Sequence, residues 1–205
     1  PLIPMIESTR GCPFSCSFCA DGMSIKNKVV RYVEGRTDAE IDYIAQRVSD
    51  VDELIIADLN FAMYKQDLKT ASSIEKSQQN WGYPKLISAS AGKNKPKRTI
   101  EVAGIIKGWT LGASIQSTAP DVLKAIKRSN ISEEAYRELI DYGNSLEGAK
   151  THSEIILALP GDTRDKHFHS LRFGIENKVN SIRMFQAILL AGTDMATAAT
   201  REKYG

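Results

Sequence analysis

Apolar positions along the chain follow two patterns, short continuous runs and longer stretches in which they recur at helical spacing. The run from Leu54 to Ala57 is typical of a buried strand, whereas the apolar positions between Ile41 and Val48 fall on one face of a helix. Runs of the first kind predict six strands, at residues 2–6, 54–57, 86–89, 111–115, 153–159 and 182–190.

Helix-start and helix-stop residues lie between these strands. Pro96 and Gly108 mark the start and end of one helix, and the acidic pair after Ser132 suits the positive end of another helix dipole. The predicted helices begin at Thr37 or Asp38 and then cover about residues 67–79, 96–108, 120–127, 132–145 and 163–177, with a short last helix from about residue 194.

Six strand–helix units at roughly 30 residues each account for the 205 residues of the chain. Strands that are separated by helices run parallel, so we expect one parallel sheet. An eightfold barrel takes about 250 residues, so six units predict a partial (β/α)6 barrel of the TIM type, open on one side. We expect residues 1–205 to form a single domain, with its active groups at the carboxyl ends of the strands.

Composition narrows the class of protein. Apolar residues make up 42% and charged residues 25% of the chain, as in ordinary globular domains, and a net charge of +2 does not indicate a nucleic-acid partner. No window approaches the roughly 18 apolar residues that a membrane span needs, and the start lacks the pattern of a signal peptide. The chain opens directly on a predicted strand, and we therefore expect it to be a piece of a longer protein.

The cysteines are the first pointer to chemistry. All three lie between positions 12 and 19. An odd, tightly clustered set argues against a disulfide framework and indicates a metal site in a reducing compartment, which predicts a cytoplasmic protein.

Cys12, Cys16 and Cys19 have the spacing C-x3-C-x2-C and directly follow the first predicted strand. Iron–sulfur clusters usually take four cysteines, so three leave one iron with an open coordination site, which metal catalysis requires. Zinc is an alternative, but it needs a fourth ligand, and the three histidines of the chain, His152, His167 and His169, are far away in sequence. Incidental reduced cysteines in a metal-free α/β enzyme are the other alternative.

This loop, with Phe18 at the aromatic position before the last cysteine, resembles the hallmark of the radical S-adenosylmethionine superfamily. The resemblance implies a [4Fe-4S] cluster on the three cysteines and S-adenosylmethionine on the open iron. It also implies reductive cleavage of the sulfonium to a 5′-deoxyadenosyl radical, and an electron donor of the flavodoxin or ferredoxin type. In that family the backbone at the position of Phe18 lies near the adenine.

The ends of the second and fourth predicted strands extend the resemblance. Asp58 and Asn60 stand where the family has a segment that contacts the amino group of S-adenosylmethionine, although either could simply cap a turn. Gln116 and Ser117 match polar residues that face the ribose and the methionyl part, or are ordinary rim residues. Arg128 matches an arginine that pairs with the methionine carboxylate, a group that arginine can grip with two donors, or is a solvated cation at a helix end.

The fifth predicted strand carries Glu154, which matches a carboxylate that bonds the ribose hydroxyls. A carboxylate inside so apolar a strand needs a partner, and a lysine or a backbone amide would also serve. The family has a glycine where this chain has Ala158, a change that we expect to leave the turn after the strand intact. After the sixth strand, residues 190–195 match a segment that shapes the rim, and no catalytic residue is assigned.

These motifs are most similar to the cobalamin-binding and methylthiotransferase-like branches of the superfamily. The cobalamin-binding look-alikes carry an N-terminal cobalamin-binding domain and a C-terminal extension, so the resemblance implies cobalamin only for a longer parent. The substrate is not indicated. A binding or scaffold module of the same fold that has lost its chemistry is the alternative function. We expect the basic stretch from Gly22 to Arg36 to be mobile and its cations to be solvated, and contact of these cations with an anionic substrate or a missing domain is the alternative.

Overall fold

The fold was analysed in a computed structural model that describes residues 2–33, 35–146 and 150–204. The strands of these residues are β1 (Met5–Ile6), β2 (Thr9–Arg10), β3 (Val30–Arg31), β4 (Glu53–Phe61), β5 (Leu86–Ala91), β6 (Leu111–Gln116), β7 (Thr151–Leu157) and β8 (Ser181–Gln186). The helices are α1 (Arg36–Ala45), α2 (Asp67–Trp81), α3 (Pro96–Ile105), α4 (Pro120–Ala125), α5 (Glu133–Ser145), α6 (Arg164–Glu176) and α7 (Ala198–Tyr204), with short 3-10 turns η1 (Ala20–Gly22) and η2 (Asp194–Ala196). No described helix has the length and apolarity to span a membrane.

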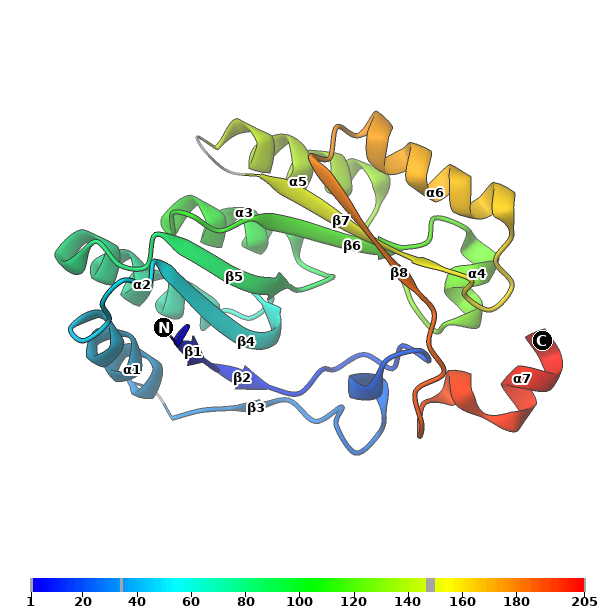
Figure 1. The fold of residues 1–205 in the computed structure, drawn as a ribbon, viewed down its shortest axis with the longest axis horizontal. Coiled ribbons are helices and arrows are strands. Elements are labelled where there is room, and N and C mark those ends of the chain that lie inside the picture. Colours follow the sequence, from blue (N-terminus) through cyan, green and yellow to red (C-terminus); the bar gives the residue numbers. More distant parts are fainter. Residues whose placement is uncertain (1, 34, 147–149, 205) are drawn as a thin grey trace.

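Six parallel strands form the open barrel that the sequence predicts, in two groups of three (Figure 1). One sheet has the order β1-β4-β5 and the other β6-β7-β8, and a single parallel bridge between Ile87 and Trp109 joins them. The expectation of one continuous sheet is therefore wrong at this junction. Among the described residues β1 and β8 each have one paired neighbour, so the two ends of the series stay apart and the barrel does not close.

The helix predictions hold closely, and the strand predictions fail mainly at the edges. The first strand is only Met5–Ile6, and the sixth ends at Gln186 rather than at residue 190. Apolar runs predicted both extensions, but Leu2 is 92% exposed and Ile188 is 64% exposed, so neither run is buried against a neighbour. A run without a partner surface cannot gain the burial that makes a strand stable.

A short antiparallel pair, β2 with β3, was not predicted. Thr9 pairs with Arg31 and Arg10 with Val30, which brings the segment after the cysteines back alongside the segment before them. The basic stretch from Gly22 to Arg36 thus contains a strand, and Glu34 within it lies outside the described residues.

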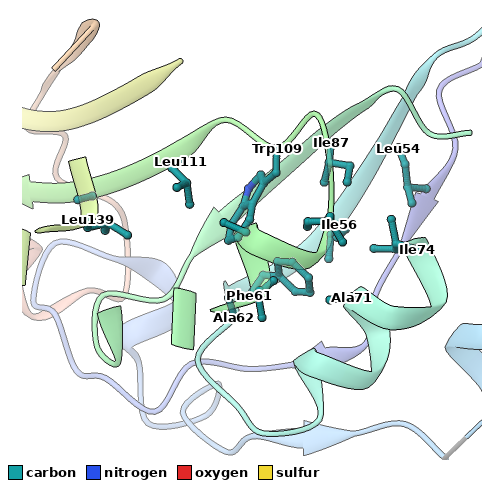
Figure 2. Packing of buried hydrophobic residues seen from close by; sticks show 14 of the residues in the cluster. Leu54, Ile56, Phe61, Ala62, Ala71, Ile74, Ile87, Trp109, Leu111 and Leu139 are labelled. Carbon is teal, nitrogen blue, oxygen red and sulfur yellow. The ribbon is translucent and has the colours of Figure 1, made fainter. Parts of the chain in front are cut away.

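The main core lies between the sheets and the helices that cover their outer face. Figure 2 shows Leu54 and Ile56 of β4 packed against Ile74 of α2, with Phe61 edge-on to Trp109 at a centroid distance of 5.3 Å. Because strand side chains alternate, the neighbours of these residues face the opposite, concave side of the sheet. That concave side holds the cavity described next.

Candidate functional site

A cavity of about 580 Å³ lies on the concave side of the open barrel. All three cysteines line it, together with residues from β4, β5, β6, β7 and β8. The polar residues that line it include Asp58, Asn60, Ser88, Ser90, Lys93, Thr110, Ser114, Gln116, Arg128, His152, Glu154 and Arg183. The cavity thus runs along the inner face of the strands, with the cysteine loop and Gln116 at their carboxyl ends, where the fold class predicts the active groups.

Backbone contacts hold the cysteine loop in place. The Ser17 N–H donates to the Ile126 carbonyl over 3.0 Å, and the Ser17 carbonyl accepts from the Met195 N–H over 2.9 Å. Gly11 has φ of +93°, and a side chain there would meet the Lys28 carbonyl oxygen at 2.3 Å. Backbone hydrogen bonds thus tie the loop to the end of α4 and to η2. At Gly11, where the loop begins, only glycine fits. Residues 190–195 shape the rim partly through this contact.

Two of the cysteine sulfurs have a nitrogen donor beside them. The Asn60 Nδ2 donates to the Cys12 Sγ over 3.3 Å, and the Lys93 Nζ lies 3.7 Å from the Cys16 Sγ. Burial raises the pKa of the Cys19 thiol. In the absence of metal Cys19 therefore favours its protonated form, and metal binding there must displace a proton.

The cysteine geometry distinguishes two kinds of metal site. Within the described ranges, no three cysteine, histidine or acidic side chains lie close enough to hold one metal ion, as zinc would require. A four-iron cluster differs because each cysteine binds a different iron, so the sulfurs stand further apart. Three cysteines around one side of a cavity fit such a cluster.

Arg128 is not a solvated cation at a helix end. It lines the cavity, donates to the Ser114 carbonyl of β6, and its Nε donates to the Asn130 Oδ1 over 3.0 Å. Asn130 in turn donates to the carbonyls of Ile115 and Ser117. Burial lowers the pKa of Arg128, but a guanidinium stays charged at neutral pH. The sequence had not pointed to Asn130, which fixes this cation against the end of β6.

Gln116 ends β6 in an unusual conformation. Its φ is +60°, its side chain is buried, and its Oε1 has no hydrogen-bond partner within the described part of the chain. A left-handed backbone and an unpaired buried carbonyl each cost free energy, and such costs gather at ligand sites. A ligand donor in the cavity would satisfy this oxygen. Ser117 differs, because its Oγ accepts from the Ala119 N–H at the start of α4 and it does not line the cavity.

Asp58 lines the cavity but already has partners in the chain. One carboxylate oxygen accepts from the Ser8 N–H over 2.7 Å, and the other accepts from the Ser8 Oγ over 2.6 Å. Burial raises the pKa of Asp58, and these hydrogen bonds act in the opposite direction. Asp58 therefore fixes the chain between β1 and β2, immediately before the cysteine loop, as a turn-capping residue would.

Glu154 faces the cavity from the middle of β7. Its Oε2 accepts from the Ser114 Oγ over 2.6 Å, so its partner is a hydroxyl of the neighbouring strand rather than a lysine or a backbone amide. In register it lies beside Arg183 of β8, and His152 lies two residues before it on the same face. Burial and then Arg183 lower the pKa of His152. Glu154 is thus part of a polar row across the cavity wall.

Phe18 also lines the cavity. It packs against a second, smaller cluster of buried residues that includes Val122, Ile126 and Met195.

Ala158, just beyond β7, has φ of +63°. The turn after β7 is present, with the Asp162 N–H donating to the Leu159 carbonyl over 2.9 Å, but the Cβ of Ala158 is strained in this conformation.

The structure adds several residues that sequence motifs did not point to, namely Lys93, Thr110, Asn130, His152 and Arg183. The alternation within β7 and β8 could have indicated that His152 and Arg183 share the face of Glu154. Lys93 lies in a loop after β5, and no periodic pattern could have placed it near a cysteine.

Comparison with known proteins agrees with this geometry. The sequence profile of the Radical SAM superfamily matches residues 6–173. The chain is 32% identical over 210 residues to "Cobalamin-dependent radical SAM methyltransferase TokK" of Streptomyces tokunonensis. It is 33% identical over 210 residues to "2-(S-pantetheinyl)-carbapenam-3-carboxylate methyltransferase" of Streptantibioticus cattleyicolor. Each match covers 97% of this chain but 30% of the relative, so the chain spans less than a third of their length.

Solved structures share the fold at low sequence identity. The radical S-adenosylmethionine methyltransferase TsrM of Kitasatospora setae, solved with cobalamin and a [4Fe-4S] cluster, superposes with a TM-score of 0.78 at 13% identity, over 94% of this chain and 36% of that one. Coproporphyrinogen III oxidase (HemN) of Escherichia coli, a radical SAM enzyme, gives a TM-score of 0.68 at 16% identity, over 100% of this chain and 47% of that one. From the profile match and the curated relatives we conclude that the chain belongs to the radical SAM superfamily of enzymes, whose cofactors are a [4Fe-4S] cluster and S-adenosylmethionine.

Proposed function

We propose that this chain is the radical SAM core of a longer methyltransferase. In this proposal Cys12, Cys16 and Cys19 hold a [4Fe-4S] cluster, and S-adenosylmethionine occupies the cavity beside it. The observation that carries the proposal is that all three cysteines line one cavity together with the orphaned Gln116 Oε1 and the partly buried cation Arg128. When bound, the cluster supplies one electron to S-adenosylmethionine.

Different polar residues of the cavity bind different parts of S-adenosylmethionine. Arg128 faces the methionine carboxylate, because its guanidinium is fixed by Asn130 and by the end of β6. The Gln116 Oε1 accepts a donor from the ligand, and Glu154 accepts from the ribose hydroxyls. Phe18 supports the adenine end from the loop itself. Asp58 acts by positioning the loop rather than by touching the ligand.

Methyl transfer is the finer part of the proposal, and it rests on the names of the two curated relatives. A parent of this kind would carry cobalamin on another domain and take electrons from a flavodoxin- or ferredoxin-type donor. The substrate would enter through the open side of the barrel. Residues 1–205 would form one domain of that parent.

The test is anaerobic iron and sulfide analysis, followed by electron paramagnetic resonance of the reduced protein with and without S-adenosylmethionine. We expect about four irons per chain and a spectrum that changes when S-adenosylmethionine is added, because one iron is open to the ligand. Absence of iron, or a spectrum that S-adenosylmethionine leaves unchanged, would overturn the proposal.

Matched variants sharpen this test. Cys16→Ala should abolish the cluster, whereas Ser17→Ala, in the same loop and also buried, should retain it. Chromatography of the reaction then separates three outcomes. S-adenosylhomocysteine indicates methyl transfer, 5′-deoxyadenosine indicates reductive cleavage, and intact S-adenosylmethionine on a loaded cluster indicates the binding-module alternative.

A further inference from the structure

We propose that Lys93 is a positioning residue that donates to the Cys16 thiolate and sets the reduction potential of the cluster. The inference rests on the proposed function, since it requires a cluster on the three cysteines. It assigns a role to a residue that lies outside the cysteine loop and outside every strand-end motif considered above.

The geometry places the ammonium of Lys93 against the cysteine loop at two points. Its Nζ lies 3.7 Å from the Cys16 Sγ and 3.9 Å from the centroid of the Phe14 ring. The first contact is within the range of a hydrogen bond to sulfur, and the second is a cation–π contact with a residue of the same loop. Both contacts hold the cation at the second cysteine.

Holding Lys93 in its position costs free energy, which indicates that a nearby anion stabilises its charge. Lys93 is partly buried and lies near a second cation, Arg128. Among the ion pairs of the described residues none joins Lys93 or Arg128 to a carboxylate. A partly buried cation without a counter-charge is unfavourable. The Cys16 thiolate, once it is a cluster ligand, supplies the missing charge.

The backbone also fixes Lys93 where it stands. The Gly92 N–H donates to the Phe61 carbonyl over 2.9 Å, and a side chain on Gly92 would meet the Met63 Cβ at 2.6 Å. The loop after β5 is thus pressed against the end of β4, and a residue larger than glycine would push the loop away. This close approach brings the side chain of Lys93 to the cysteine loop.

The physical effect follows from charge. Reduction adds one negative charge to the cluster, and hydrogen bonds and cations at the sulfurs favour the reduced form. Lys93 therefore makes the cluster easier to reduce by a protein donor. Asn60 supplies the corresponding neutral donor at Cys12, so the two cysteines differ in the charge of their partners.

The test is a reductive titration of the loaded protein, followed by electron paramagnetic resonance. We expect Lys93→Met to hold iron as the unmodified chain does but to require a more negative potential for reduction. Lys93→Arg, which keeps the charge, should recover most of the shift. Lys97→Met removes an exposed lysine of α3 and should leave the potential unchanged.

Two controls keep the outcomes separate. If Lys93→Met fails to fold, Lys93→Gln retains a nitrogen donor without the charge and should show a shift of the same sign. An unchanged reduction potential in a loaded, folded Lys93 variant would overturn the inference. If the potential is unchanged and the variant binds S-adenosylmethionine more weakly, Lys93 is a ligand contact and the inference is also overturned. Absence of iron from the unmodified chain would instead overturn the proposed function.

Discussion

The two halves of the open barrel are built differently. In the β1-β4-β5 half, side chains at the contact between β4 and α2 are fully enclosed. Leu54, Phe61 and Ile74 have no exposed surface. In the β6-β7-β8 half, the last strand leaves Met184 61% exposed and Phe185 50% exposed. Both halves end in an edge strand, but β1 is only two residues long and buries Ile6, whereas β8 is longer and leaves two large apolar side chains in solvent.

This difference matters for the site because both halves contribute to it. The first half fixes the cysteine loop through Asp58 and brings Lys93 and Asn60 to the sulfurs. The second half supplies Gln116 and Glu154 to the same cavity. The cysteine loop is thus held from both halves, by Asp58 of the first half and by backbone contacts with Ile126 and Met195 of the second.

The largest expected effect is on the stability of the first half. Ile74→Ala leaves a cavity in a fully buried site and should lower the free energy of unfolding by about 2–5 kcal/mol. Met184→Ala, on the exposed face of β8, should change it by less than about 0.5 kcal/mol. Urea unfolding measures both. Equal costs at the two positions would show that Met184 of β8 is as well packed in solution as Ile74 of α2.

The second prediction concerns a buried carboxylate of the first half. Asp67, at the start of α2, has no exposed surface, and burial raises its pKa to about 6. Its folded-state pKa is above the unfolded value, so its contribution to stability is complete at pH below about 4 and is lost as pH rises through 6. A shift of about two pKa units corresponds to about 3 kcal/mol.

Asp67→Asn should therefore be more stable than the unmodified chain at pH 8, by up to about 3 kcal/mol, and similar to it near pH 4. Asparagine keeps an oxygen for the Tyr64 N–H, which Asp67 accepts over 2.9 Å, so the helix start is preserved. Urea unfolding at a series of pH values measures the difference. A gain that does not depend on pH would show that the carboxylate is not responsible.

The accuracy of sequence reasoning also differs between features that are local and features that are not. Helices were placed well because their signals lie within a few residues. Two helices are predicted to begin at Ser132 and Thr163, and in the structure each of these side chains accepts a hydrogen bond from the N–H three residues later and caps the helix. The cysteine loop was equally local, since one short motif carries all three sulfurs.

Features that depend on distant partners were missed or left open. The junction between the two sheets depends on Ile87 and Trp109, which are apolar residues with no distinctive pattern. Asp58 shows the same limit in the site, because a carboxylate at a strand end can serve a ligand or a turn. Only the structure reveals that Ser8 occupies both of its oxygens. Lys93 reaches the cysteines through a glycine contact that no periodicity predicts.

The smallest expected effect compares one strained alanine from each half. Ala62 follows β4 with φ of +67°, and Ala158 follows β7 with φ of +63°. Glycine relieves the strain of a Cβ in this conformation but adds chain entropy to the unfolded state. At the exposed Ala158 relief of strain dominates, so Ala158→Gly should raise the free energy of unfolding by about 0.5–1 kcal/mol.

Ala62→Gly should be close to neutral, because Ala62 has no exposed surface and its methyl group contributes about 0.8 kcal/mol of burial that glycine loses. Thermal unfolding of the two variants side by side measures the contrast. Equal gains would mean that the methyl group of Ala62 is not packed in solution. Since the two backbones are nearly the same, any difference between the variants reports the packing of the two halves directly.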